Sequence, residues 1–241
     1  MNGVLYIAAT PIGNMGDVTF RVIEMLQSCD IIACEDTRQT MKLLSKYDIS
    51  SKRLISYHEH NKRSSGENII KLLESGLSVI LVSDAGMPAI SDPGYDIVKK
   101  AVDCGFDVKV LPGASASLSA LALSGLPTDR FIFEGFLPKD SKSLAARVQA
   151  IMSNDATSIV YCSPHSLCST LRLLSDEDGS RYAAAAHELT KLHESVHRGT
   201  LSELSKYFED NPPRGEYVLV IDRAPSIKKS TDLNEMEQKA H

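Results

Sequence analysis

Short apolar runs rich in β-branched residues alternate with segments of helical spacing along most of the chain. This alternation is typical of α/β proteins, in which strands build a sheet and the intervening helices cover it. In the first half it predicts strands near 3–9, 30–34, 53–57, 78–82 and 107–111, and helices near 19–28, 37–47, 65–75 and 94–104. Ser64 or Ser65 is expected to cap the third of these helices. The small, apolar segment 118–126 predicts one more helix, buried on all sides.

The segment "GLPTDR" at 125–130 interrupts this pattern with Gly and Pro and predicts a domain boundary. We therefore expect an N-terminal α/β domain of residues 1–125 and a C-terminal α/β domain of residues 126–223. The second half predicts strands near 131–134, 157–162, 182–187, 193–198 and 216–222, and helices near 141–153, 165–175 and 200–209. Thr200 and Glu203 have the spacing of a capping box at the last helix. Residues 224–241 are polar and predict a flexible tail.

Composition limits the class of protein. With 241 residues, 43% of them hydrophobic, the chain can bury one large core or two modest ones. It has neither a signal-peptide pattern nor an apolar run long enough for a membrane span, so we expect a cytoplasmic protein without membrane contact. Five cysteines without a C-x-x-C pair predict reduced packing residues. The formal net charge of -5 argues against indiscriminate nucleic-acid binding, but local basic patches leave an RNA partner open.

Loops rich in turn-forming residues follow three of the predicted strands: "TPIGN" (10–14), "SDAGMPAISDPG" (83–94) and "PGASAS" (112–117). In open α/β sheets, ligands bind in the crevice beyond the carboxyl ends of the strands, so these loops are expected to converge on one cleft. The nucleotide-binding patterns G-x-G-x-x-G and G-x-x-x-x-G-K-[ST] are both missing from the sequence. Hydroxyls, carboxylates and free backbone groups instead suit a compact zwitterion or a cationic sulfonium.

Six segments carry a family resemblance: "LYIAATPIGN" (5–14), "CEDTR" (34–38), "SDAGMPAISDPG" (83–94), "PGASA" (112–116), "EGFLPK" (134–139) and "ELTKLHE" (188–194). In this order they resemble the ribosomal RNA small subunit methyltransferase I family of the tetrapyrrole methylase superfamily, over roughly residues 3–223. The resemblance implies a two-domain tetrapyrrole methylase-like (class III methyltransferase) fold of α/β type, with a cofactor cleft between the domains. It further implies S-adenosylmethionine as cofactor and a homodimer. The implied reaction is 2'-O-methylation of a cytidine ribose in the decoding region of 16S rRNA, within the small ribosomal subunit.

The resemblance also assigns cofactor-binding positions in the loops and in the second domain: Pro11, Val82, Ser83, Asp84, Met87, Ser115, Ala116, Cys162, Leu189 and Thr190. The chain departs from the family pattern at three positions. Met87 replaces a usual Thr, His187 stands where an Arg is usual, and Ser166 stands where a basic residue is common. RNA contacts that the family makes through those basic residues are therefore expected to be weaker here or made elsewhere.

Catalysis of such a reaction needs little from the protein beyond positioning, but a ribose hydroxyl is a poor nucleophile. A base that takes its proton, or a cation that stabilises the developing alkoxide, would accelerate the transfer. The segment "HELTKLHE" offers both, and Glu188 and Lys191 are the predicted catalytic residues. The alternative for this pair is a salt-bridged strand edge without a catalytic role.

The segment "YHEHN" (57–61) invites a metal interpretation through His58 and His60. A catalytic zinc site would also need a third ligand and an open position, and we predict no metal. We expect this segment to be a polar loop at the substrate entrance rather than a metal site. Lys62 and Arg63 lie beside it in the sequence and would contact phosphate. Three more basic residues would extend that patch: Lys139, Lys142 and Arg147. The default for them is ordinary solvent exposure without an RNA contact. Two other functions stay open, a methylase of a tetrapyrrole or other small acceptor on the same fold, and a non-catalytic RNA-binding or ribosome-assembly factor.

Overall fold

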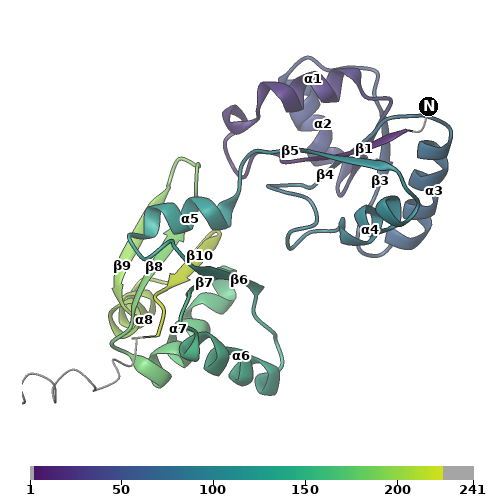
Figure 1. Ribbon diagram of the computed structural model, residues 1–241. Helices are drawn as coiled ribbons and strands as arrows, with labels where there is room; N and C mark the ends of the chain where they lie inside the picture. The colour runs from purple at the N-terminus through teal and green to yellow at the C-terminus, as the bar shows by residue number, and fades with distance from the viewer. Residues whose placement is uncertain (1–2, 225–241) are drawn as a thin grey trace, which may run out of the picture.

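The computed structural model describes residues 3–224, which form two five-stranded sheets (Figure 1). The first sheet has the order β3-β2-β4-β1-β5, and all its pairs are parallel. Its strands are β1 (Val4–Ala8), β2 (Ile31–Cys34), β3 (Arg53–Ser56), β4 (Val79–Val82) and β5 (Asp107–Leu111). β2 and β4 are buried along their whole length, as expected of central strands with helices on both faces.

Helices on both faces bury the first sheet. They are α1 (Phe20–Ser28), α2 (Thr37–Lys46), α3 (Lys62–Glu74) and α4 (Tyr95–Asp103). Because successive strand residues point to opposite faces, Val79 and Leu81 pack towards α3 and α4, whereas Ile80 and Val82 pack towards α1 and α2. A short 3-10 helix, η1 (Met15–Asp17), was not predicted.

The predicted cap of α3 is wrong. The helix begins at Lys62, with Asn61 at the N-cap position, so Ser64 and Ser65 lie inside its first turn. The Ser65 hydroxyl donates instead to the Ser56 carbonyl at 2.9 Å and ties the helix to the end of β3.

The second sheet has the order β6-β7-β10-β8-β9, and among its pairs only β6 and β7 are parallel. Its strands are β6 (Phe131–Phe136), β7 (Thr157–Cys162), β8 (Tyr182–His187), β9 (Ser195–Thr200) and β10 (Tyr217–Ile221). One face packs against α6 (Ser141–Ser153), α7 (Pro164–Asp178) and α8 (Leu201–Asp210). The predicted capping box of α8 is confirmed, because Thr200 Oγ1 accepts from the Glu203 backbone N–H at 3.2 Å while Glu203 accepts from the Thr200 N–H at 2.8 Å.

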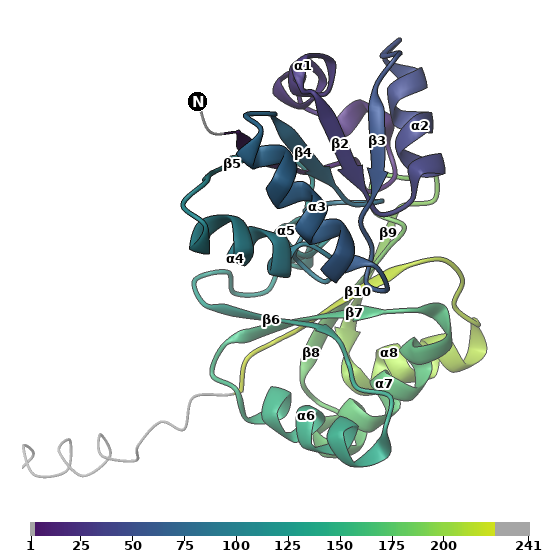
Figure 2. The ribbon, with the colours of Figure 1, turned by 90° about the vertical axis from the view of Figure 1, so that its right-hand side faces the viewer.

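Helix α5 (Ala116–Ser124) covers the other face of the second sheet, although it follows the last strand of the first. Both views show it beside that sheet, between the two halves of the molecule (Figures 1 and 2). Ala120 and Leu121 are buried there, but Leu118 is 53% and Leu123 39% exposed. The prediction of a helix buried on all sides is therefore wrong, because α5 covers only one sheet. The boundary at 125/126 stays a prediction, and the packing of α5 favours a division closer to Gly113.

The loops after β1, β4 and β5 lie at the same end of the first sheet and face the second half of the chain (Figure 2). Within residues 3–224, no helix is at once long enough and apolar enough to cross a bilayer. The predicted flexible tail lies, from residue 225 onward, outside the described residues.

Candidate functional site: a cleft between the two sheets

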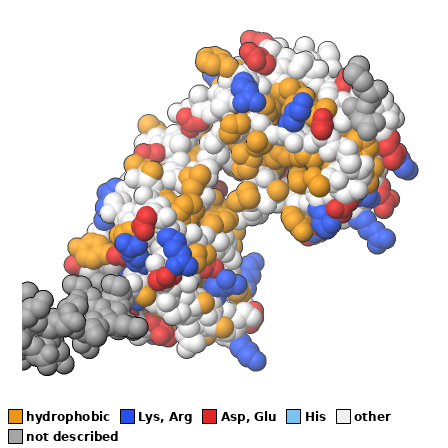
Figure 3. All heavy atoms as spheres, in the orientation of Figure 1, with side chains coloured by type: hydrophobic (Ala, Val, Ile, Leu, Met, Phe, Trp, Pro, Cys, Tyr) orange, Lys and Arg blue, Asp and Glu red, His pale blue; other side chains and the backbone are white. Residues whose placement is uncertain are grey.

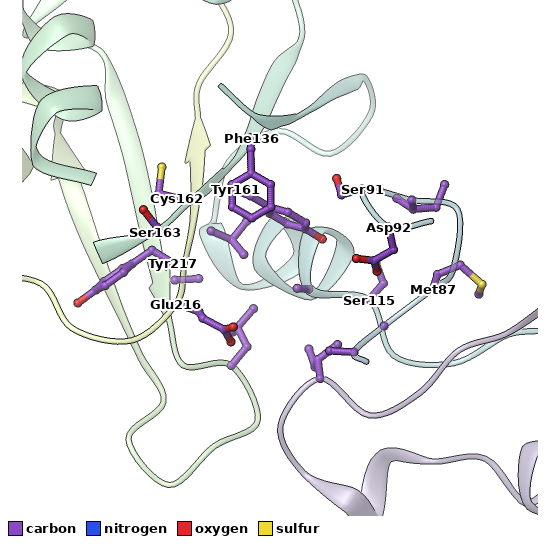
Figure 4. Close-up of a pocket in the computed structure, with 18 of the residues that line it drawn as sticks. Met87, Ser91, Asp92, Ser115, Phe136, Tyr161, Cys162, Ser163, Glu216 and Tyr217 are labelled. Atoms are coloured by element: carbon purple, nitrogen blue, oxygen red, sulfur yellow. The ribbon is translucent and has the colours of Figure 1, made fainter. Parts of the chain in front are cut away.

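A cavity of about 440 Å³ lies where the loops of the first half meet the second sheet (Figure 4). All three predicted loops contribute to its wall, together with β7, the end of β8 and the start of β10. Its lining residues are Ile12, Ala85, Gly86, Met87, Ile90, Ser91, Asp92, Ser115, Ala116, Phe136, Tyr161, Cys162, Ser163, Pro164, Ala186, Leu189, Glu216, Tyr217 and Val218. The expected convergence of the three loops on one cleft is therefore confirmed.

The loop 83–94 is held in an unusual backbone conformation. Ala89 and Ser91 have positive φ angles of 70° and 64°, which non-glycine residues adopt only at a cost of about 1–3 kcal/mol. Gly94 has a φ of 153°, and a Cβ placed there would lie 2.8 Å from the backbone nitrogen of Ala89. A close turn of this kind requires glycine. The turn directs Ser91 and Asp92 to the cavity wall (Figure 4).

Five of the predicted cofactor-binding residues line the cavity. Met87 comes from the loop after β4, Ser115 and Ala116 from the start of α5, Cys162 from the end of β7 and Leu189 from the loop after β8. Ser115 caps α5, so the N-terminal end of this helix opens on the cavity.

Four of the other predicted residues shape the loops around the cavity without lining it. Val82 and Ser83 are buried, and Thr10 Oγ1 donates to the Ser83 carbonyl at 3.1 Å. Asp84 is exposed, and its Oδ1 accepts from the Asp36 backbone N–H at 3.1 Å. Pro11 lies between Thr10 and the lining residue Ile12.

Thr190, the last of the predicted cofactor residues, joins the two halves of the chain. Its Oγ1 accepts from the Asn14 backbone N–H at 3.1 Å. At Gly13 a Cβ would lie 2.5 Å from the Lys191 side chain and 3.0 Å from Thr190 Oγ1, so the absence of a side chain there permits the contact. The loop after β8 is thereby fixed against the loop after β1.

Aromatic rings form one wall of the cavity. Tyr161 meets Phe136 edge to face at a centroid distance of 5.5 Å, and meets Phe133 in the same way at 5.0 Å. Phe136 is 63% exposed to solvent. Edge-to-face pairs of this kind hold the rings in fixed orientations, and they leave a flat apolar surface at the cavity rim.

Asp92 is a lining residue that the sequence did not single out. Burial raises the pKa of its carboxyl to about 6, and the negative charge of Glu35 contributes to this shift. An interaction with the Ser83 side chain lowers the pKa by a smaller amount. A perturbed carboxyl in a cleft is a recognised sign of a functional group. The only sequence signal was the second Ser-Asp pair of the loop, which nothing distinguished from the first.

The predicted catalytic pair forms an ion-pair network at the edge of the cavity. Lys191 Nζ lies 2.9 Å from Glu188 Oε1 and 2.7 Å from Glu216 Oε2, and Glu216 is a lining residue. Glu188 Oε1 also accepts from the Glu216 backbone N–H at 2.9 Å. Burial opposes ionisation of Glu188, but Lys191 and the Glu216 N–H outweigh it and lower its pKa. The positive φ of 47° at Glu188 turns its side chain back into this network.

Comparisons with known proteins agree with this architecture. The family model described as "Tetrapyrrole (Corrin/Porphyrin) Methylases" matches residues 4–205. A protein of Bacillus subtilis named "Ribosomal RNA small subunit methyltransferase I" is 46% identical over 236 residues, which cover 98% of this chain and 79% of the relative. The chain belongs to the ribosomal RNA small subunit methyltransferase I family. A protein of the same name from Thermotoga maritima is 43% identical, over 91% of this chain and 98% of the relative.

Solved structures share the fold of this rRNA methyltransferase I family member. Diphthine synthase has a TM-score of 0.67 at 17% identity, over 92% of this chain and 90% of its own. Uroporphyrin-III-C-methyltransferase from Thermus thermophilus has a TM-score of 0.64 at 17% identity, over 91% of this chain and 94% of its own. At such identities the likeness concerns the fold alone. The predicted two-domain class III methyltransferase fold is confirmed.

Residues that depart from the family pattern have structural contacts. The His187 ring stacks on Tyr217 at 4.5 Å, and its Nε2 lies 2.8 Å from the Arg214 carbonyl. Ser166 forms a capping box with Ser163 at the start of α7.

Burial raises the pKa of the Cys162 thiol to about 12, so this lining residue presents a neutral sulfur to the cavity.

The predicted phosphate-contacting residues lie in two places. A second cavity of about 300 Å³ is lined by Lys62, Arg63, Gly66, Asp96, Ile97 and Lys100. In it, Lys62 Nζ is paired with Glu59 at 2.7 Å and with Asp96 at 2.9 Å, whereas Arg63 is exposed. Lys139, Lys142 and Arg147 are exposed near the start of α6, and Arg147 pairs with Glu134 at 2.9 Å.

The two histidines of "YHEHN" lie with their ring centroids 6.0 Å apart. Across residues 3–224, no three His, Cys, Asp or Glu side chains gather as a metal site would require.

Proposed function

We propose that this protein transfers a methyl group from S-adenosylmethionine to ribosomal RNA, as the 2'-O-methylation of a cytidine ribose in the decoding region of 16S rRNA. The observation that carries the proposal is the cavity of about 440 Å³ at the meeting of three strand-end loops and the second sheet. Family membership supplies the reaction class, because the most similar relatives compared carry the name of a small-subunit rRNA methyltransferase.

The cavity fits the proposed cofactor in size and chemistry. Its volume lies within the range of about 300–1,000 Å³ that small-molecule sites occupy. Apolar residues suited to an adenine ring, among them Leu189 and Val218, line one side. The N-terminal end of α5 favours a carboxylate, and the Asp92 carboxylate favours a cationic sulfur. When bound, S-adenosylmethionine supplies a methyl group that its sulfonium charge makes electrophilic.

The residues that would hold the cofactor are those predicted from the sequence. Met87, Ser115, Ala116, Cys162 and Leu189 would contact it, since they line the cavity. The remaining five would act through the backbone of their loops: Pro11, Val82, Ser83, Asp84 and Thr190.

Glu188 and Lys191 are proposed to have different roles in catalysis. The Lys191 ammonium, held beside the lining residue Glu216, provides positive charge near an alkoxide developing in the cavity. Glu188 orients that ammonium through its ion pair of 2.9 Å. The alternative, a salt bridge that only joins two loops, predicts that neutral substitutions at Lys191 leave turnover unchanged.

RNA is proposed to meet the basic residues on either side of the cleft. Arg63 on α3 and Lys139 and Lys142 near α6 are exposed and carry charge that phosphates can neutralise. Such contacts position the substrate without reading its sequence. The net charge of -5 then limits binding to these patches.

A homodimer is supported by the surface over β5 and α5, where hydrophobic side chains gather (Figure 3). Val110 on β5 is 56% exposed, and Leu118 on α5 is 53% exposed. Exposed apolar patches of this kind mark interaction sites. The cytoplasmic location and the small-subunit context stay predictions.

The test is methyl transfer from labelled S-adenosylmethionine to small ribosomal subunits that lack the modification, followed by mapping of the label. We expect the label on the 2'-oxygen of one cytidine, where it blocks alkaline cleavage of the adjacent phosphodiester. Label on a base, or on no RNA, would contradict the proposal. Transfer to a tetrapyrrole but not to RNA would favour the small-acceptor methylase. No heat of binding with S-adenosylmethionine in calorimetry would favour the non-catalytic RNA-binding factor.

A further inference from the structure

We propose that Asp92 is the catalytic base, whose carboxylate accepts the proton of the ribose 2'-hydroxyl as the methyl group is transferred. This inference rests on the proposed function and deepens it, because it assigns the proton to a residue that the family resemblance did not single out. The cavity wall, the loop geometry and the charges around Asp92 carry it.

Few side chains in the cavity wall can accept a proton near neutral pH. The titratable groups there are Asp92, Glu216, Tyr161, Tyr217 and Cys162. Burial raises the pKa of both tyrosines and of the cysteine, so all three are protonated near neutral pH. Only the two carboxylates remain as bases.

Glu216 and the neighbouring Glu188 are already engaged. Glu216 Oε2 lies 2.7 Å from Lys191 Nζ, and Glu188 Oε1 accepts both from Lys191 Nζ and from the Glu216 N–H. Glu188 is a weak base, because protonation would break its ion pair with Lys191. The lowered pKa of Glu188 agrees with its weak basicity.

Asp92 differs from these carboxylates, because it forms no ion pair with any residue in the described range 3–224. The positive φ angles of Ala89 and Ser91 fold the loop so that Asp92 lines the cavity. Figure 4 shows the Tyr161 hydroxyl directed towards the side of the cavity that carries Asp92. Strain of this kind persists where the surrounding structure requires it, and it is concentrated at functional sites.

The groups that face Asp92 make it a base suited to neutral pH. Burial disfavours ionisation of Asp92 most strongly. The negative charge of Glu35, which follows β2, adds to this effect, and that of Asp84, which follows β4, adds less. The Ser83 side chain lowers the pKa of Asp92 by less than Glu35 raises it but by more than Asp84 does, and Tyr161 faces Asp92 from β7 as a neutral phenol. The resulting pKa of about 6 leaves Asp92 ionised at pH 7.5 but far more basic than an ordinary aspartate.

The proposed step balances as follows. The ribose O2' forms a bond to the methyl carbon while the carbon–sulfur bond breaks, and the electron pair of that bond stays on sulfur. The proton of the hydroxyl moves to a carboxylate oxygen of Asp92, from which it passes to solvent. The positive charge on sulfur is lost, and one proton is released for each methyl group transferred.

The test compares Asp92→Asn with the wild type on small subunits that lack the modification. Asparagine keeps the shape and the acceptor oxygen but cannot take the proton. We expect kcat to fall by roughly 10²- to 10⁴-fold, with an unchanged KM for the subunit and a much smaller loss of calorimetric affinity for S-adenosylmethionine. Asp103→Asn, the same change on an exposed residue at the end of α4, serves as the matched control and should retain full activity.

Two further measurements separate a base from a merely structural residue. The wild-type rate should fall as the pH drops below about 6, and the residual rate of Asp92→Asn should lack this dependence. In Asp92→Gly, added formate should restore part of the turnover by supplying the missing carboxylate. NMR titration of carboxyl-labelled aspartate in the free protein should show a group titrating near pH 6 that is missing in Asp92→Asn.

Three results would overturn the inference. Wild-type turnover by Asp92→Asn would exclude proton transfer to Asp92. A loss of turnover matched by an equal loss of affinity for S-adenosylmethionine would assign Asp92 to cofactor binding alone. If the wild type itself modifies no ribose, the proposed function and this inference both fail, whereas the first two results leave the proposed function intact.

Discussion

Thr10 and Gly86 exchange two backbone hydrogen bonds, with N···O distances of 2.9 and 3.0 Å, across the carboxyl ends of β1 and β4. This bridge ties the loops after β1 and β4 into one unit. Gly86 has a φ of 81°, a conformation that L-residues with a side chain rarely adopt. The cleft between the two sheets therefore depends on a glycine that permits two loops to pair beyond the end of their sheet.

Gly86→Val should weaken cofactor binding strongly. The new side chain is strained at this φ by about 1–2 kcal/mol, and its Cβ would lie 3.4 Å from the Ile12 side chain in the cavity wall. We expect a lower free energy of unfolding in urea and a clear loss of calorimetric affinity for S-adenosylmethionine. Gly105→Val is the matched control, because Gly105 has a φ of 77° but nothing within 4 Å of its would-be Cβ. An equal loss of affinity in both variants would contradict the role of the bridge.

Asp84→Ala should also reduce the affinity for S-adenosylmethionine, with little loss of stability. Asp84 is exposed and holds the segment after β2 through the Asp36 N–H at 3.1 Å. Loss of one such hydrogen bond costs about 1 kcal/mol. Asp84→Asn keeps an acceptor but removes the charge, so calorimetry on both variants separates the two contributions. An unchanged affinity in Asp84→Ala would refute its assignment to the cofactor site.

The sequence predicted the elements of the fold well. Buried strands appear in it as continuous apolar runs, and amphipathic helices appear as apolar residues that recur with the helical period. β5 at 107–111 and α6 at 141–153 have the predicted bounds. The convergence of the three loops followed from the rule that ligands bind at the carboxyl ends of strands. These features depend on local patterns and on one topological rule.

Other features depend on tertiary packing and left no local signal. The exposure of Leu118 depends on which sheet α5 covers, and the sequence places that helix directly after a strand of the other sheet. The place of Asp92 in the cavity depends on positive φ angles at Ala89 and Ser91, which are not glycines. The partners of Glu188 depend on the meeting of two loops 28 residues apart in the chain.

Leu118→Glu should dissociate the proposed homodimer. A charge buried in an apolar interface without a partner costs about 3–5 kcal/mol, which weakens association by at least roughly 100-fold. Sedimentation velocity over a range of concentrations measures the change. Met41→Glu is the control, because Met41 is exposed on α2, outside the surface formed by β5 and α5. A monomeric wild type, or a dimer that tolerates Leu118→Glu, would exclude this surface as the interface.

The pH dependence of stability provides a test of the electrostatics at Asp92 that is independent of activity. Its pKa is raised from 3.8 to about 6 in the folded protein, so the folded state binds more protons than the unfolded state between these values. The free energy of unfolding should therefore fall as the pH rises through this window. Asp92→Asn removes that effect and should stabilise the protein at pH 7.5 by on the order of 1 kcal/mol, after a discount for the partial exposure of the carboxyl to solvent. The gain should shrink as the pH falls towards 4.5, as measured by urea unfolding.

Asp178→Asn should change the free energy of unfolding in the opposite direction in the same experiment. A hydrogen bond from the Ser180 hydroxyl at 2.7 Å lowers the pKa of Asp178, so its ionised form stabilises the folded state above the unfolded pKa. This variant should be less stable than the wild type at pH 7.5, and the difference should diminish as the pH falls. If Asp92→Asn also proved less stable than the wild type at pH 7.5, Asp92 would have an ordinary or lowered pKa. Burial and the charge of Glu35 would then not make it the strongest base of the cavity.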